Sequence, residues 1–211
     1  MVTIQYLGHS SFKIASDDFS VVLDPFKNGS VNGLIFPKNI EANLVLCSHE
    51  HHDHNAREYI KLVPSTKNLI YREYLLPHDH EQGNKRGSVY GRIFSFDNIS
   101  FAHLGDVGDI SPLNLFDPFI GVDVLFLPIN GFYTISAKET KLLTDYIKPK
   151  LIIPMHYQIK NPPSGYPDNG QIEIFKSLFP NYLKVSYTIT MNPDLYSYNA
   201  LIFNTKGVFY D

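Results

Sequence analysis

The chain has 211 residues, of which 44% are hydrophobic and 18% are charged, so we expect residues 1–211 to fold as a single domain with a sizeable core. The formal net charge is -3, and the basic residues form no stripe that could track a phosphate backbone, which argues against a nucleic-acid partner. The opening segment MVTIQYLGHSSF has the pattern of neither a secretory signal nor a membrane span. We therefore expect a cytoplasmic protein without a membrane partner.

Short apolar runs recur along the chain, and each of them stops at a polar residue. Runs of about four to six residues rich in Val, Ile, Leu and Phe are typical of central strands that are covered on both faces. The sequence therefore predicts strands that end in loops. These strands are expected within residues 19–26, 42–54, 98–109, 122–131 and 150–158.

Three segments between or after these strands have helical patterns. Residues 55–63 begin with an Asn that can cap a helix, and residues 136–148 begin with Ser136 followed three positions later by Glu139, the spacing of a capping box. Residues 170–179 repeat the amphipathic spacing. We predict a helix in each segment, which gives an alternation of strands and helices.

The rest of the chain contributes a loop, a terminal hairpin and one cysteine. Residues 160–170 are rich in Pro and Gly and are predicted to form a surface loop. Residues 199–211 are predicted to form two strands joined by a turn at Thr205 to Gly207. Cys47 lies in an apolar run and has no second cysteine to pair with, so we expect a small buried residue and no thiolate metal site.

The segment SHEHHDH, residues 48–54, places four histidines and one aspartate within six positions at the end of a predicted buried strand. Imidazole and carboxylate groups bind zinc and similar ions. In an extended chain His49 and His51 point to the same side and can reach one ion. Asp53 and His54 lie beyond the turn and can face a second ion about 3.5–4 Å away.

Two distant strand ends offer further ligands for these ions. Asp106 follows FAHLG, and His156 follows LIIPM. Side chains at strand ends are positioned by a rigid scaffold, so these two residues can complete the site. The alternative is an exposed histidine tract that binds metal only adventitiously.

SHEHHDH resembles the H-x-H-x-D-H signature of the metallo-β-lactamase-fold superfamily, and LGD and PMHY resemble its later metal-binding segments. Within the superfamily the chain is similar to a small group of metal-dependent hydrolases that includes relatives of ascorbate-6-phosphate lactonase. The shared motifs are LGHSSFKI, LDPF, HDHEQGNKRG, HLGDVG, DVLFLPING and KLIIPMHY. The resemblance covers roughly residues 3–160 and is specific for the fold but not for the substrate.

The resemblance implies an α+β four-layer αββα sandwich, the metallo-β-lactamase fold, with a two-metal site at one edge of the sheets. It assigns a first ion, a second ion and a bridging carboxylate. The first ion would be held by His49, His51 and His78, the second by Asp53, His54 and His156, and Asp106 would bridge the two.

His78 is assigned by matching HD and KRG to the family pattern, and His80 is equally close in the sequence. Either histidine can therefore complete the first site, and the alternative is that both are exposed loop residues. Arg86 can bind an anionic substrate group, because a guanidinium matches phosphate or carboxylate geometry. The adjacent Lys85 is expected to be a solvated loop residue.

Four other polar residues have two interpretations or a supporting role. His9 is either a group that faces the substrate or the ligands, or a hydrogen-bonded structural histidine. Asp24 resembles the family carboxylate that fixes the ring of a ligand histidine, but an Asp before Pro can also simply start a turn. His52 is expected at the surface, and His103 is expected to pack behind the ligands.

The expected chemistry is hydrolysis. Two cations held by imidazoles and carboxylates lower the pKa of a bound water and polarise a substrate oxygen. Asp53 is the expected catalytic residue, because it would orient the attacking hydroxide as well as hold the second ion. The expected cofactors are two divalent metal ions, with zinc favoured and manganese, iron or nickel also compatible with these ligand types.

The expected substrate is a small molecule with an ester-like bond, a phosphodiester or a lactone, that can carry an anionic group. A nuclease of the same superfamily is disfavoured because the chain has no added clamp segment and no basic excess. A non-catalytic metal-binding member of the fold is disfavoured by the complete set of expected ligands. The resemblance also implies a homo-oligomer.

Overall fold

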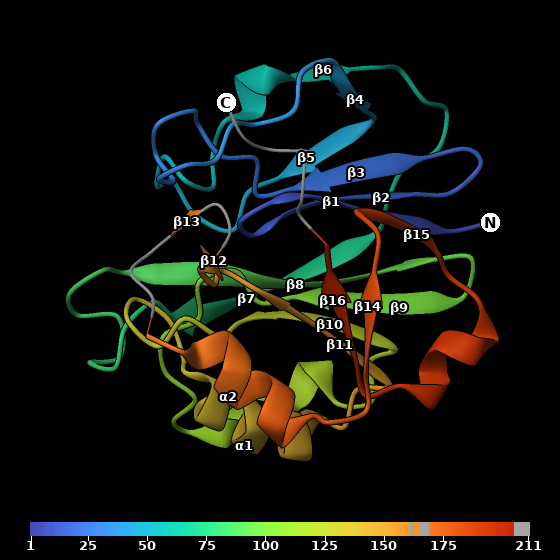
Figure 1. The fold of residues 1–211 in the computed structure, drawn as a ribbon. Coiled ribbons are helices and arrows are strands. Elements are labelled where there is room, and N and C mark those ends of the chain that lie inside the picture. The colour runs from blue at the N-terminus through green and yellow to red at the C-terminus, as the bar shows by residue number, and fades with distance from the viewer. Residues whose placement is uncertain (161–162, 165–168, 205–211) are drawn as a thin grey trace.

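Two mixed β-sheets pack against each other in the computed structural model of the chain, which describes residues 1–160, 163–164 and 169–204 (Figure 1). The five-stranded sheet has the strand order β15-β1-β2-β3-β5, and the seven-stranded sheet has the order β14-β16-β11-β10-β9-β8-β7. The strands of the five-stranded sheet are β1 (Thr3–Gly8), β2 (Ser11–Ala15), β3 (Ser20–Leu23), β5 (Leu44–Leu46) and β15 (Thr188–Thr190).

The other elements complete the sandwich and its outer layers. The strands of the seven-stranded sheet are β7 (Tyr71–Pro77), β8 (Ser88–Phe96), β9 (Ile99–His103), β10 (Val124–Pro128), β11 (Leu151–Met155), β14 (Tyr182–Val185) and β16 (Ala200–Phe203). Two small ladders pair β4 (Ile40–Ala42) with β6 (Ile60–Leu62), and β12 (Ile159–Lys160) with β13 (Pro163–Ser164). The helices are α1 (Ala137–Ile147) and α2 (Gln171–Leu178), with 3-10 turns η1 (Arg57–Tyr59), η2 (Leu113–Phe119) and η3 (Pro193–Ser197).

The central strands β10 and β11 are buried along their whole length, as their apolar runs predict. Their side chains alternate between two cores because successive residues of a strand point to opposite faces. Val124 and Phe126 pack into the core shared with the five-stranded sheet. Leu125 and Leu127 pack into the core shared with the helices α1 and α2.

The predicted helices at 136–148 and 170–179 are confirmed as α1 and α2. Ser136 and Glu139 form the predicted capping box at the start of α1. The helix predicted over 55–63 is wrong: the segment forms only the turn η1, followed by β6, which pairs in parallel with β4. Asn55 does not cap a helix, because its side-chain amide donates to the backbone oxygen of Glu50 at 2.8 Å.

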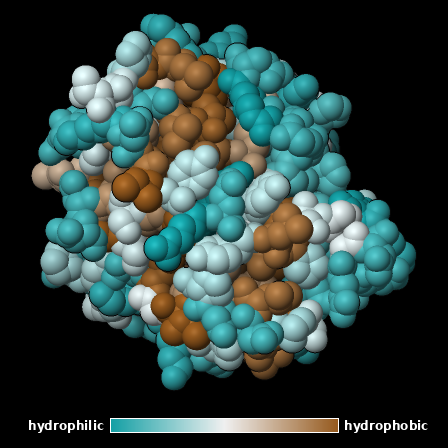
Figure 2. All heavy atoms as spheres, turned by 180° about the vertical axis from the view of Figure 1, so that it is seen from behind, coloured by the Kyte–Doolittle hydropathy of each residue, from teal (hydrophilic) through white to brown (hydrophobic). Residues whose placement is uncertain are grey.

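The two outer layers of the sandwich differ. Helices α1 and α2 cover the outer side of the seven-stranded sheet, whereas β4, β6 and η1 lie over the five-stranded sheet (Figure 1). The predicted sandwich is therefore confirmed, and its second outer layer is built mainly of loops. On the face opposite to that of Figure 1, hydrophobic side chains form patches interrupted by hydrophilic ones (Figure 2). Among the described residues, neither α-helix has the length and apolar character needed to cross a bilayer.

The end of the chain is described only in part. Residues 200–203 form β16, as predicted, while the predicted turn at Thr205 to Gly207 and the strand after it lie outside the described residues. Most of the predicted loop at 160–170 also lies outside them. The candidate site is built from described residues within 1–160.

Candidate metal centre

The carboxyl ends of strands from both sheets meet at one edge of the sandwich. Strands β1, β3 and β5 share one direction in the first sheet, and β7, β9, β10 and β11 share one direction in the second. The residues that follow these strands therefore collect at the same edge, although they are far apart in sequence. The rings of His49, after β5, and His78, after β7, lie with their centroids 4.7 Å apart.

Three imidazoles form a first group at this edge: His49, His51 and His78, each offering a ring nitrogen within 4.8 Å of the others. Nδ1 of His51 is 3.3 Å from Nε2 of His78. Nε2 of His49 is buried and has no hydrogen-bond partner among the described residues. A buried polar atom without a partner is costly, so nitrogens gathered in this way fit a bound cation.

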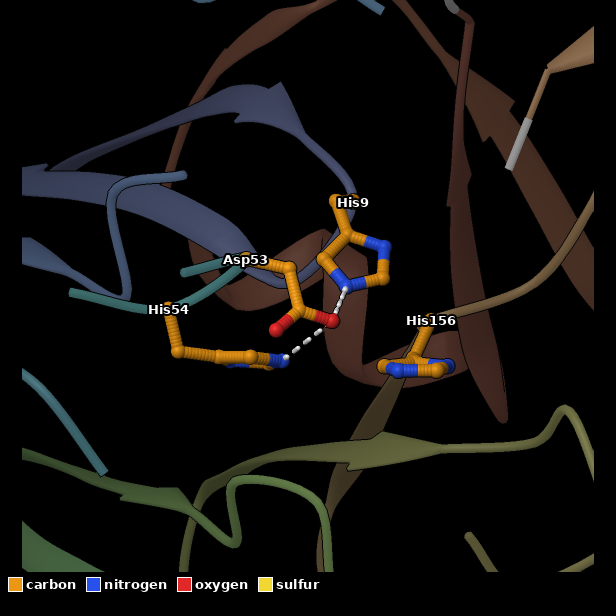
Figure 3. A group of neighbouring side chains, drawn as sticks. All are labelled: His9, Asp53, His54 and His156. Carbon is orange, nitrogen blue, oxygen red and sulfur yellow. Dashed lines mark ion pairs between the residues drawn. The ribbon is translucent and has the colours of Figure 1, made fainter. Parts of the chain in front are cut away.

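A second group lies beside the first and contains Asp53, His54, His156 and His9 (Figure 3). Oδ2 of Asp53 is 3.6 Å from Nε2 of His9 and 3.6 Å from Nε2 of His54. The rings of His9 and His156 pack with centroids 4.3 Å apart. The structure thus brings together the three residues expected around the second ion and adds His9 to them.

Asp106 connects the two groups. Its Oδ2 is 3.1 Å from Nε2 of His54 and 3.0 Å from Nε2 of His156, and it shares a third potential metal-binding set with His49 and His54. Its other oxygen, Oδ1, is buried and has no hydrogen-bond partner among the described residues. One carboxylate therefore faces both groups, which is the position expected of a bridging ligand.

The charges of these groups suit a divalent cation. Burial lowers the pKa of His49 to about 3 and also lowers the pKa of His78, so both imidazoles are neutral at pH 7 and keep a free lone pair. Burial alone would raise the pKa of Asp106, but His156 and His54 outweigh it and hold that pKa well below its usual range. His49 and His78 therefore offer neutral imidazoles beside an ionised carboxylate, a donor set that zinc and related ions take.

Asp24 orients His54 directly, and His49 through Ser48, by hydrogen bonds on the side away from the centre. Its oxygens accept hydrogen bonds from the backbone N–H and the hydroxyl of Ser48, both at 2.6 Å, and Oδ2 is 2.8 Å from Nδ1 of His54. Because a carboxylate only accepts, Nδ1 of His54 carries the proton and Nε2 is left for the centre. Ser48 Oγ is in turn 2.9 Å from Nδ1 of His49. Because the Ser48 hydroxyl donates its proton to Asp24, its oxygen accepts from Nδ1 of His49, so His49 also carries its proton on Nδ1 and leaves Nε2 for the centre. Of the two interpretations of Asp24, the structure shows the hydrogen bond to a candidate ligand.

Close backbone contacts hold the edge together. His9, Asp24 and His156 all have a positive φ, at 55°, 43° and 54°, a conformation that costs a non-glycine residue about 1–3 kcal/mol and recurs at functional sites. A Cβ on Gly105 would lie 2.5 Å from Cβ of Ser48. Only glycine therefore lets the strand end that carries Asp106 approach Ser48.

Sequence reasoning did not identify Ser48 or Asp79 as contributors to the site. Asp79 accepts four backbone hydrogen bonds, from Glu81, Gly83, Lys85 and Arg86, at 2.7–3.1 Å. It thereby shapes the loop that follows His78. An Asp followed by a Gly-containing loop is a signal for a local turn in the sequence, but it does not tell which backbone groups the carboxylate binds.

The structure separates the two alternatives for the first group. His78 is buried beside His49 and His51, whereas the side chain of His80 is 55% exposed and lies 3.5 Å from Glu139.

We expect His78→Ala to weaken metal binding by at least about a hundredfold, since it removes one imidazole from the first group. His80→Ala, two positions away, should leave metal binding unchanged. Titration of the metal-free variants with zinc, followed by calorimetry, measures both affinities. Equal affinities for the two variants would remove His78 from the metal centre.

The remaining histidines lie outside the groups. His52 is exposed, as expected. His103 is buried, and its Nε2 is 3.1 Å from the backbone oxygen of Ser10, so it packs behind the centre.

Lys85 is exposed and pairs with Glu81, and Arg86 places its guanidinium 3.8 Å from the ring centroid of Tyr133.

The chain is similar in sequence to known metal-dependent hydrolases. Residues 3–156 match the sequence model of the β-lactamase superfamily domain. A metal-dependent hydrolase from Thermococcus kodakarensis is 26% identical, with 80% of this chain and 90% of the relative covered. A metal-dependent hydrolase from Staphylothermus marinus is also 26% identical, with 94% of this chain and 100% of the relative covered.

The fold is found in solved structures. A Thermotoga maritima protein, described as a zinc-dependent hydrolase of the metallo-β-lactamase superfamily, superimposes with a TM-score of 0.73 at 24% identity, covering 96% of this chain and 98% of that one. An isothiocyanate hydrolase from Delia radicum gut bacteria gives a TM-score of 0.59 at 12% identity, covering 99% and 100%. At these identities the likeness establishes the fold alone.

Proposed function

Because the chain belongs to the β-lactamase superfamily, as its match over residues 3–156 shows, we propose that it hydrolyses a small ester-like substrate with the help of two divalent metal ions. That it is a metal-dependent hydrolase agrees with the names of its relatives. The number of ions and the ester-like bond, a phosphodiester or a lactone, are the proposed details.

The observation that carries the proposal is the position of Asp106 between the two groups. Each group offers at least three nitrogen or oxygen donors within 4.8 Å of one another, enough for one ion apiece. Asp106 is the carboxylate that lies against His54 and His156 and also shares a potential metal-binding set with His49. His49, His51 and His78 would hold the first ion, and Asp53, His54 and His156 the second. Zinc is the favoured ion, since the donors are imidazoles and carboxylates.

When bound, the two ions would supply a hydroxide nucleophile near neutral pH and a positive charge for the substrate oxygen. Asp53 is the residue best placed to orient that nucleophile, because its carboxylate is charged and its side chain, 13% exposed, is the most exposed in the second group. The carboxylate stays ionised because His9 and His54 outweigh burial and lower its pKa. The buried His9 lies 3.6 Å from Asp53.

A protein nucleophile is not needed for this reaction, and the cysteine is unsuited to be one. Burial raises the pKa of Cys47 to about 12, so its thiol stays protonated at pH 7. Ser48 is already engaged with Asp24 and His49. Both observations favour water as the attacking group.

We expect Asp53→Ala to lower kcat by roughly a hundredfold or more, since it removes both a ligand and the group that orients the nucleophile. The measurement is a panel of chromogenic phosphodiesters, phosphomonoesters, carboxyl esters and lactones with zinc- or manganese-loaded protein. Glu58→Ala is the matched control, because Glu58 is exposed and pairs with Lys27 away from both groups. If wild type and Asp53→Ala hydrolyse the whole panel equally, hydrolysis at this centre is refuted.

A further inference from the structure

We infer that a cleft beside the first group binds an anionic group of the substrate, a phosphate or a carboxylate, and that Arg86 is the residue that recognises it. This inference rests on the proposed function, because it places the anion next to the bond that the metal centre would hydrolyse. It specifies that the substrate of the proposed hydrolysis carries an anionic group.

The cleft opens directly onto the metal centre. It has a volume of about 480 Å³, which falls in the range of sites for small molecules. His49 and His51 of the first group line one side of it, and the loop after β7 and the strand β8 line the other. A molecule in this cleft would therefore reach the first group without any movement of the backbone.

Three arginines line this cleft: Arg57, Arg86 and Arg92. Two of them are already neutralised by carboxylates. Arg57 makes a bidentate ion pair with Glu50: Nη1 and Nη2 donate to its two carboxylate oxygens at 3.0 and 2.6 Å. Nε and Nη2 of the buried Arg92 lie 2.7 and 2.6 Å from Oε1 of Glu73, its cross-strand neighbour.

Arg86 differs from these two because no carboxylate pairs with it in the part of the chain that the structure describes. Its guanidinium carbon instead lies over the ring of Tyr133, 3.8 Å from the centroid. A cation–π contact of this kind holds the guanidinium in place without using its N–H groups as hydrogen-bond donors. Arg86 is thus the uncompensated positive charge of the cleft.

The backbone that carries Arg86 is fixed to the metal centre. Asp79 accepts the N–H of Arg86 at 2.7 Å, and the N–H of His78 donates to the oxygen of Gly87 at 3.0 Å. The loop is therefore closed between His78, a member of the first group, and the residue after Arg86. This closure sets the distance between the anion site and the proposed site of hydrolysis.

The chemistry of a guanidinium indicates what it would bind. Its planar fork of donors matches the two oxygens of a carboxylate or a phosphate. The charges of Arg57 and Arg92 are compensated by Glu50 and Glu73, so we expect the cleft to bind one anionic group. A neutral ester would fill the same space but leave Arg86 without a partner.

The test compares Arg86→Gln with Lys85→Gln. Each variant loses one positive charge from the same exposed loop, but Lys85 pairs with Glu81 and does not line the cleft. Binding of inorganic phosphate and of acetate to metal-loaded protein is measured by calorimetry. Arg86→Gln should raise the Kd of the better-bound anion about tenfold or more, while Lys85→Gln should change it less than twofold. The anion with the larger loss identifies the substrate group as phosphate or carboxylate.

A kinetic comparison uses two chromogenic esters that differ only in a remote carboxylate. Arg86→Gln should raise KM for the anionic ester about tenfold and leave the neutral ester unchanged. Equal anion affinities in the two variants, or an equal rise in KM for both esters, would overturn the inference. If the wild type hydrolyses neither ester but Arg86→Gln still weakens phosphate or acetate binding, the proposed function fails while the anion site stands.

Discussion

Replacing Asp106 by alanine is expected to abolish binding of both ions at stoichiometric metal and to lower kcat/KM on the order of a thousandfold. The reason is that one oxygen of Asp106 lies 3.1 Å from His54 and 3.0 Å from His156 while the other is buried without a partner. No other carboxylate among the described residues occupies this position between the groups. Metal content by mass spectrometry and hydrolysis of the best substrate of the panel are the two measurements.

Asp109→Ala is the matched control for this change, because Asp109 lies in the same loop and, among the described residues, its carboxylate accepts only the local N–H of Ser111, at 2.8 Å. It should keep both ions. Asp106→Asn preserves the size of the side chain and separates the loss of charge from a packing defect, which circular dichroism would detect. Two ions retained by Asp106→Ala would show that the groups do not share this ligand.

Replacing Asp24 by alanine is expected to have the largest effect on stability. Asp24 is buried and bonds to Ser48 and His54, and removal of one partner from such a buried set costs about 3–5 kcal/mol. The unfolding midpoint should fall on the order of 10 °C. Metal affinity should also fall about tenfold to a hundredfold, because His54 and, through Ser48, His49 lose their orientation.

Asp123 provides a control with the same local motif. Its Oδ2 accepts the N–H and the hydroxyl of Ser100, both at 2.7 Å, but no histidine of either group contacts it. Asp123→Ala should lower the melting temperature and leave metal affinity unchanged. If Asp24→Ala behaves in the same way, Asp24 is a turn residue only, and its bond to His54 has no role in metal binding.

The local part of the candidate site could be predicted because the spacing within residues 48–54 decides it. His49 and His51 belong to the first group and Asp53 and His54 to the second, as predicted, although the chain bends from Ser48 onward instead of continuing the extended strand β5. The strand-end argument also brings Asp106 and His156 to the same edge, since parallel strands end together. These predictions need no knowledge of contacts beyond the element that carries each residue.

The other features of the site and the fold depend on contacts between segments that are far apart in the sequence, and the sequence of one segment does not determine those contacts. The choice between His78 and His80 is settled by a loop that Asp79 ties to four backbone groups. The helix predicted over 55–63 is lost because Ile60–Leu62 pair with Ile40–Ala42, so tertiary pairing overrides the local pattern. The role of Ser48 appears only when the end of β3 is beside the end of β5.

The dispersion of the centre along the chain has a consequence for how the protein matures. His9, His49, Asp106 and His156 come from segments that meet only when both sheets have docked. The complete donor set for the two proposed ions therefore forms only after the chain well past residue 156 has left the ribosome. Selection among metal ions by that donor set would accordingly follow translation and depend on the ion concentrations where folding ends.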